Sequence, residues 1–246
     1  MKVRVGIIGG TGISELLEKK IEKNVKTPYG RPSDKVSVGE INGKEVAFIT
    51  RHGKKHKIPP HNINHRANIY ALKSIGVEKI ISIACAGIIN VNIQIGDFII
   101  LDDFIDFTRK PYTFFDKFKE KPVHVDLTEP FSPKLREILI EVCKEKGYSF
   151  QDKGIYVNTP GPRLETPAEI RMFNRMDADV IGQTIVPEAV LSRELGIEYV
   201  SIAVGVNYAC GISEKPLSYE EIEQGMKWKE KQLKEIIKEA VGKINL

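Results

Sequence analysis

Short apolar runs rich in Val and Ile alternate along the chain with segments of helical periodicity. Such runs fit strands that are buried on both faces of a sheet, and their alternation with helices is typical of a helix-covered sheet. The pattern therefore predicts an α/β fold rather than a sandwich or a helical bundle. The expected strands are residues 3–8, 45–50, 79–84, 97–101, 154–158 and 198–204.

Capping residues mark where several helices should begin and end. Ser132 stands before a proline, and Thr166 and Ser218 each stand three residues before a glutamate, which is the spacing of a capping box. Helix ends are expected at glycines that follow helical segments, namely Gly76, Gly147 and Gly196.

Residues 108–133 are rich in Pro and Phe and show no clear periodicity. We expect a long surface excursion there. Long structureless insertions in compact domains tend to be functional, so this one is expected to cover a pocket or to reach a neighbouring subunit.

A glycine-rich turn, residues 6–12, follows the first expected strand. Backbone N–H groups in such a turn can approach an anion closely, which favours a phosphate site. A dinucleotide site is one alternative, but Glu15 stands where the third glycine of G-x-G-x-x-G belongs. A tight turn without a ligand is the other alternative.

Basic residues cluster just past the expected strand 45–50. Arg51 and His52 stand at its carboxyl end, where open α/β sheets bind ligands, and a guanidinium suits bidentate contact with phosphate. The histidines at 52, 56 and 61 also suggest a metal, but they fall on loop sequence without neighbouring carboxylates, which argues against zinc. A solvated basic loop is the remaining alternative.

Three further segments place small or polar residues at expected strand ends. Residues 84–87 are small enough for their backbone to contact a ligand, and a turn rich in Pro delivers Glu165 just before a helix. Residues 181–188 and 204–210 put polar side chains where an α/β sheet binds its ligands. Taken one at a time, these segments are equally well explained by packing or helix capping.

Together and in this order, the five segments resemble the trimeric purine nucleoside phosphorylase and methylthioadenosine phosphorylase family, over residues 5–224. The resemblance implies one nucleoside phosphorylase-like domain over residues 1–246, with a central mixed, mostly parallel sheet flanked by helices. It also implies a pentosyltransferase that cleaves a purine nucleoside with inorganic phosphate as co-substrate and needs no metal or organic cofactor.

The resemblance assigns roles to individual residues. The expected phosphate-binding residues are Thr11, Arg51, His52, Cys85, Ala86 and Thr184. The expected nucleoside-binding residues are His124, Leu164, Glu165, Gln183, Asn207, Tyr208, Ala209 and Tyr219. Arg51, His52 and Asn207 are the expected catalytic residues, and His124 would come from a neighbouring subunit of a homotrimer or a dimer of trimers.

The sequence departs from the family where the nucleoside binds. Methylthioadenosine phosphorylases have aspartates at the positions of Asn207 and Ala209, whereas the inosine and guanosine enzymes have Asn at the first position and a Glu that matches Glu165. An Asn amide can donate to purine O6 or N7, and a Glu carboxylate can accept from the N1–H of a 6-oxopurine. Gln183 occupies a position that is usually Met, which leaves its sugar contacts open.

The 5′ end of the nucleoside is expected at Tyr219, where the inosine and guanosine enzymes have a His. An aromatic ring offers a surface on which a methylthio group can pack. The sequence therefore predicts S-methyl-5′-thioinosine as substrate, with S-methyl-5′-thioadenosine as the alternative. Two other classes stay open, a dinucleotide-dependent oxidoreductase and a non-catalytic nucleoside sensor.

Composition narrows these possibilities slightly. The 246 residues are 41% hydrophobic and 28% charged, as in one globular domain, and a net charge of +4 gives no reason to expect nucleic-acid binding. The three cysteines, Cys85, Cys143 and Cys210, show no metal-ligand spacing and no pairing pattern. No signal peptide and no apolar run of membrane-spanning length is evident, so we expect a cytoplasmic protein without membrane contact.

Overall fold

The computed structural model describes residues 3–118, 121–213 and 215–245, and the side chains of Thr11, Gly12 and Tyr219 lie outside that description. In the described residues, eleven strands form one sheet. They are β1 (Val5–Gly9), β2 (Glu18–Lys23), β3 (Val36–Ile41), β4 (Lys44–Thr50), β5 (Lys79–Ile88), β6 (Phe98–Ile100), β7 (Asp103–Asp106), β8 (Phe150–Gln151), β9 (Ile155–Asn158), β10 (Val180–Gly182) and β11 (Glu198–Tyr208). The sheet is mixed and mostly parallel, as predicted, because six of its ten described strand pairs are parallel.

The sheet branches at β5. The main path runs β2-β3-β4-β1-β5-β10-β9-β7, while β11 also pairs with β5 and leads to β6 and β8. Strands β4, β1, β5 and β11 are mutually parallel, so their carboxyl ends meet at one edge. At that edge the register of β11 shifts between Gly205 and Asn207.

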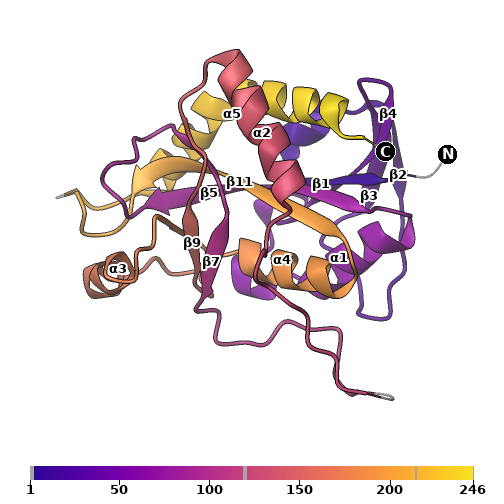
Figure 1. The fold of residues 1–246 in the computed structure, drawn as a ribbon, viewed down its shortest axis with the longest axis horizontal. Coiled ribbons are helices and arrows are strands. Elements are labelled where there is room, and N and C mark those ends of the chain that lie inside the picture. The colour runs from indigo at the N-terminus through magenta and orange to yellow at the C-terminus, as the bar shows by residue number, and fades with distance from the viewer. Residues whose placement is uncertain (1–2, 119–120, 214, 246) are drawn as a thin grey trace.

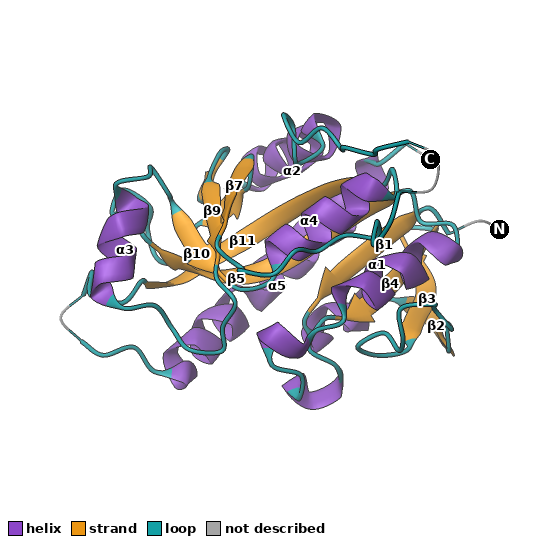
Figure 2. Ribbon diagram, turned by 90° about the horizontal axis from the view of Figure 1, so that it is seen from below, coloured by secondary structure: helices purple, strands orange, loops and turns teal. Residues whose placement is uncertain are grey.

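Helices cover both faces of the sheet (Figures 1 and 2). α2 (Pro133–Lys146) and α5 (Tyr219–Lys243) pack together on one face, and α1 (His65–Ser74) and α4 (Ile185–Glu194) pack together on the other. α3 (Pro167–Asn174) lies beside β9 and β10. Three short 3-10 helices complete the described helical elements: η1 (Thr11–Leu16), η2 (Lys54–His56) and η3 (Pro60–Asn62).

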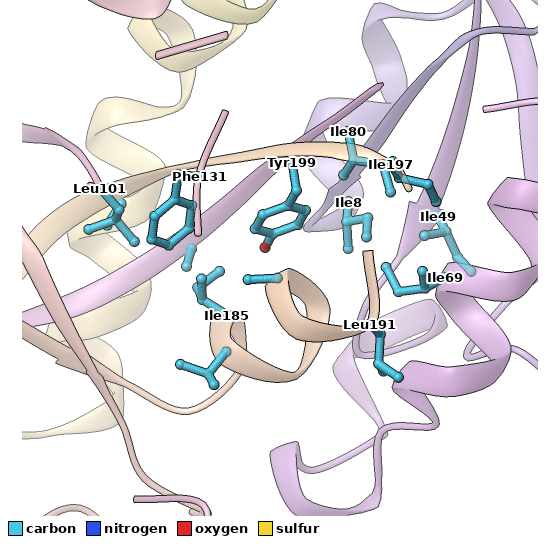
Figure 3. Packing of buried hydrophobic residues seen from close by; sticks show 14 of the residues in the cluster. Ile8, Ile49, Ile69, Ile80, Leu101, Phe131, Ile185, Leu191, Ile197 and Tyr199 are labelled. Carbon is cyan, nitrogen blue, oxygen red and sulfur yellow. The ribbon is translucent and has the colours of Figure 1, made fainter. Parts of the chain in front are cut away.

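Successive side chains along the central strands point to opposite faces of the sheet and pack into two separate hydrophobic cores. In β1, Ile7 joins the core under α2 and α5, whereas Ile8 joins the core under α1 and α4. Figure 3 shows the second core, where Ile8 and Ile80 of the sheet face Leu191 of α4. Each fully buried side chain of this size stabilises the fold by about 1.5 to 3 kcal/mol, which explains why both strand faces are apolar.

All six predicted strands are present, and β5 and β11 run several residues further than expected, to Ile88 and Tyr208. The expected N-caps are confirmed, because Ser132, Thr166 and Ser218 accept hydrogen bonds at the starts of α2, α3 and α5. The expected glycines follow α2, α1 and α4, all with positive φ: Gly147, Gly76 and Gly196.

Five strands were missed, namely β2, β3, β7, β8 and β10. Every residue of β2 is exposed, so it carries no apolar pattern, and β8 and β10 have only two and three residues. Hydrophobic periodicity is uninformative in such short or exposed segments.

The long excursion is confirmed: the described part of residues 108–132 contains no helix or strand. It crosses the face formed by α1 and α4. Thr113 Oγ1 and the Phe114 backbone N donate to the Glu194 carboxylate, at 2.7 and 2.6 Å, and Arg193 Nε donates to the Asp126 carbonyl at 2.9 Å. None of the helices in the described chain has the combination of length and apolar character that a transmembrane segment requires.

Candidate active site

A cavity of about 500 Å³ opens where the carboxyl ends of β4, β5, β10 and β11 meet. Loops after these strands supply its walls. The structure brings most of the predicted site residues into this lining: Arg51, His52, Cys85, Ala86, Leu164, Glu165, Gln183, Thr184, Asn207 and Ala209. Four of the five segments identified separately in the sequence thus converge on one cavity, whereas the described residues of the glycine-rich turn 6–12 are not among its lining residues.

Two predicted residues do not line the cavity. The Tyr208 hydroxyl lies 3.5 Å from the Ile93 carbonyl, and His124 lies on the excursion, with its ring edge-on to Phe118. Tyr208 is thus not among the residues that line the cavity of this chain, and its assignment to the nucleoside site stays a prediction. The Thr11 and Tyr219 side chains fall outside the described residues.

The lining also includes residues that were not identified from the sequence. One group comes from the loop around η2 and η3, and the other is apolar and lies near the start of α5. They include His56, Lys57, Pro59 and Pro60 in the first group, and Val206, Leu217 and Ile222 in the second. The first group directly follows Arg51 and His52 in the sequence. The basic loop that begins at this pair could therefore have identified these lining residues.

Arg51 is buried at the base of the cavity, in an ion pair with Glu188 of α4. Its Nε donates to Glu188 Oε1 at 2.5 Å and its Nη2 to Glu188 Oε2 at 3.0 Å. Nη2 also donates to Ser82 Oγ at 2.6 Å, and Nη1 donates to the Ile83 carbonyl at 2.8 Å. A guanidinium has five N–H donors, so one remains for a ligand. The bidentate phosphate contact expected from the sequence would need a donor that is already in use.

Glu188 is the hub of this buried network. Besides Arg51, it accepts hydrogen bonds from Ser82 of β5 at 2.8 Å and from the Tyr199 hydroxyl of β11 at 2.9 Å. Figure 3 shows that hydroxyl pointing toward α4. Burial alone would raise the pKa of Glu188, but the Arg51 charge and the hydrogen bonds from Arg51 and Ser82 together outweigh burial and lower it. Glu188 therefore stays ionised and holds Arg51 in place.

His52 is held as a neutral ring. Its Nδ1 lies 2.8 Å from the Ile58 carbonyl, which can only accept, so Nδ1 carries the proton. Burial, together with the Arg51 charge, lowers the pKa of His52 to about 4. The His56 ring stacks on it with centroids 4.1 Å apart. The remaining nitrogen, Nε2, is then an acceptor and can receive a hydrogen bond from a protonated anion.

Glu165 and Asn207 line the same cavity from different elements. Glu165 is 8% exposed, and its Oε1 accepts from Thr159 Oγ1 at 2.5 Å. Burial raises the pKa of Glu165 despite this hydrogen bond. Asn207 donates one amide hydrogen to the Tyr208 carbonyl at 2.8 Å, which leaves its second hydrogen and its oxygen for a ligand.

The chain belongs to the phosphorylase superfamily, whose family model matches residues 4–242. A network of anion-binding groups beside a cavity with a buried carboxylate and an amide is consistent with that class.

Relatives within the superfamily are more specific. The chain is 47% identical over 242 residues to S-methyl-5′-thioadenosine phosphorylase of Pyrococcus abyssi, covering 98% of this chain and 93% of that protein. It is 45% identical over 246 residues to 6-oxopurine nucleoside phosphorylase of Pyrococcus furiosus, covering 97% and 92%. The structure of methylthioadenosine phosphorylase from Schistosoma mansoni in complex with adenine superimposes with a TM-score of 0.92 at 32% identity, covering 98% and 91%. The chain is an enzyme of this purine nucleoside phosphorylase type.

Removing the charge of Glu188 should destabilise the fold strongly. Glu188→Gln leaves the buried Arg51 charge uncompensated, and breaking a buried ion pair in this way costs about 3 to 5 kcal/mol. Denaturant unfolding would measure the loss. Glu230→Gln is the matched control, since it breaks a partly exposed ion pair with Lys234 and should cost less than about 1 kcal/mol. Equal effects of the two substitutions would contradict a supporting role for the Arg51–Glu188 pair.

Stability should fall as the pH drops from about 6.5 to about 4. Burial lowers the pKa of His65 from its usual 6.5 to about 4, so in this window the unfolded chain binds a proton that the folded chain excludes. His65 contributes roughly 3 kcal/mol to this loss. His65→Gln should flatten the pH dependence of the free energy of unfolding, whereas His61→Gln, on the exposed η3, should leave it unchanged. An unaltered slope in His65→Gln would refute this assignment.

Proposed function

We propose that this enzyme cleaves 6-oxopurine nucleosides with inorganic phosphate, and that S-methyl-5′-thioinosine is its preferred substrate. The observation that carries the proposal is the pairing of Glu165 with Asn207 in one cavity with Arg51 and His52. The first pair suits a 6-oxopurine base, and the second pair suits an oxyanion.

The base would be recognised by complementary hydrogen bonds. The Glu165 carboxylate accepts from the N1–H of hypoxanthine or guanine, and the free amide hydrogen of Asn207 donates to O6 or N7. Adenine has no N1–H, so Glu165 Oε1 keeps its hydrogen bond from Thr159 but Oε2 receives none from the base. An unpaired buried polar group costs about 1 to 3 kcal/mol, which is enough for clear discrimination.

The 5′ end of the nucleoside would face an apolar wall. Leu217 and Ile222, which flank the start of α5, line the cavity together with Val206. Such a wall buries a methylthio group favourably but leaves a 5′-hydroxyl without a partner. This supports the methylthio nucleoside over the ordinary one.

The reaction needs no covalent enzyme intermediate. A phosphate oxygen forms a bond to C1′ of the sugar while the C1′–N9 bond breaks, and the bonding electrons leave with the purine, which then takes up a proton. Positive charge develops on the sugar, as in glycoside cleavage, and the phosphate anion beneath it stabilises that charge. Arg51, His52, Thr184 and the backbone at Cys85 and Ala86 would hold the phosphate, and Thr11 would join them. Asn207 would stabilise negative charge on the departing base.

Phosphorolysis of S-methyl-5′-thioadenosine is the second candidate, and one observation favours it. Because burial raises the pKa of Glu165, a protonated Glu165 could donate to N1 of adenine. Asn207 would then turn its amide oxygen toward the 6-amino group, an exchange of O and N that gives up its hydrogen bond to the Tyr208 carbonyl. Relatives of both names match this chain at similar identity.

The remaining features of the proposal concern assembly and setting. The active enzyme is a homotrimer or a dimer of trimers, in which the excursion at residues 108–133 contributes His124 to the active site of a neighbouring subunit. It works in the cytoplasm, with phosphate as co-substrate and with no metal or organic cofactor. The course of the excursion across α1 and α4, clear of its own cavity, supports the intersubunit role.

A substrate panel at saturating phosphate tests the proposal. We expect kcat/KM to be highest for methylthioinosine, lower for inosine and guanosine, and about 5- to 150-fold lower for methylthioadenosine and adenosine than for their 6-oxo counterparts. Base release should stop without phosphate. An inosine value equal to that of methylthioinosine would reject the 5′ assignment, and higher values for the adenosine compounds would reject the base assignment.

Asn207→Asp should weaken the enzyme on 6-oxopurines. A carboxylate cannot donate to O6 or N7, so kcat/KM for inosine-type substrates should fall at least about 10-fold, while the ratio of adenosine-type to inosine-type activity rises. Steady-state kinetics on both substrate types would measure this. Asn92→Asp makes the same change on an exposed loop and should alter neither value. A retained preference in Asn207→Asp would place base recognition elsewhere.

A further inference from the structure

We propose that Gln183 is a positioning residue, whose amide fastens the loop that carries Leu164 and Glu165 to the end of β10. The loop spans residues 159–166, between β9 and α3. The effect on base selection rests on the proposed function, whereas the fastening itself does not. The family resemblance places Gln183 at the sugar, so a structural role toward the base wall is a separate assignment.

The contact between Gln183 and the loop is direct. Gln183 Nε2 donates to the Arg163 carbonyl at 3.0 Å. A Cβ built on Gly161 would lie only 2.2 Å from Gln183 Oε1, so the amide packs against the bare Cα of that glycine. Gly161 also has a φ of 63°, which favours glycine. The amide therefore touches the loop at two neighbouring points.

Elsewhere the described loop is held at its two ends and by the side chain of Arg163. At one end the Thr159 backbone N donates to the Gly182 carbonyl at 2.9 Å, and at the other Thr166 caps α3. The Arg163 guanidinium turns outward to Glu169 of α3, at 2.7 Å. Among described side chains outside the loop and α3, Gln183 is the one with a hydrogen bond to residues 160–165.

The consequence for the cavity follows from this arrangement. Leu164 and Glu165 come directly after Arg163 and line the same cavity as Asn207. If the Arg163 carbonyl is released, the Thr159 hydroxyl still binds the Glu165 carboxylate, but the backbone that carries Glu165 is no longer tied to Gln183. A Met at this position would fill space but has no N–H to donate, so in a chain with Met the middle of the loop would be held by the Arg163–Glu169 ion pair and not by residue 183.

Two substitutions at Gln183 test the proposal. Gln183→Met removes the donor at similar size. We expect KM for the 6-oxopurine nucleoside to rise about 3- to 10-fold, the range for loss of one hydrogen bond, while kcat and KM for phosphate change less than twofold. Gln183→Glu places a carboxylate against the Arg163 carbonyl. Its KM should exceed that of Gln183→Met at pH 8 and should approach the wild-type value at acidic pH, where a protonated Glu can donate again.

Hydrogen exchange gives a readout that does not depend on catalysis. Without nucleoside, the backbone N–H groups of residues 161 and 163–165 should exchange faster in both variants at pH 8, and also in Gly161→Ala, whose Cβ would collide with the Gln183 amide. Gly196→Ala is the matched control, because Gly196 also has a positive φ of 64° but has no atom near the added Cβ. It should leave exchange in the loop unchanged.

The outcomes separate the two proposals. Unchanged exchange in the loop, or a Gln183→Glu variant whose nucleoside KM matches wild type at every pH, would overturn the positioning role. The second result would instead indicate that residue 183 contacts a sugar hydroxyl directly, because a carboxylate can also accept a hydrogen bond from that hydroxyl. Faster exchange and a raised KM, in an enzyme that prefers adenosine-type substrates, would support the positioning role and reject the proposed base preference.

Discussion

The ion pair between Arg51 and Glu188 is the constraint on which the cavity depends. Neither charge could be buried without the other, since an isolated buried charge costs far more than the few kcal/mol by which a domain is stable. Their hydrogen bonds join the end of β4 to α4, and Ser82 and Tyr199 add β5 and β11 to the same network. Strands that meet at the cavity are thereby fixed to one helix behind them.

The same pairing sets the electrostatics of the anion site. Arg51 is compensated by Glu188, and His52 is neutral because its pKa lies near 4, so neither brings a net charge to the cavity. Phosphate would be held by directed donors and by the Nε2 acceptor of His52 rather than by a cluster of free cations. Lys57 is the uncompensated positive side chain among these lining residues, and it comes from the exposed loop. Fixed groups of this kind need little reorganisation during reaction.

Much of the fold could be predicted because its central strands are apolar and its helix starts carry explicit caps. Prediction failed where the pattern is absent, as in the exposed β2, or too short, as in β10, and it also missed β3, whose six residues are mostly buried. Most site residues could also be located, since they follow recognisable strand ends and resemble one family. The hydrogen-bond partners of these residues could not be predicted. Glu188 occupies two of the Arg51 donors, and Gln183 reaches the Arg163 carbonyl, through contacts between segments that are distant in sequence.

Binding of the free base isolates the central claim from the chemistry and from the 5′ group. Calorimetric titration of the wild-type enzyme at saturating phosphate would compare hypoxanthine with adenine, which differ at the positions that face Glu165 and Asn207. If these residues recognise a 6-oxopurine, hypoxanthine should bind at least about 10-fold more tightly, because adenine has no N1–H to donate to the second oxygen of the buried Glu165 carboxylate. Equal affinities, or tighter binding of adenine, would contradict the account.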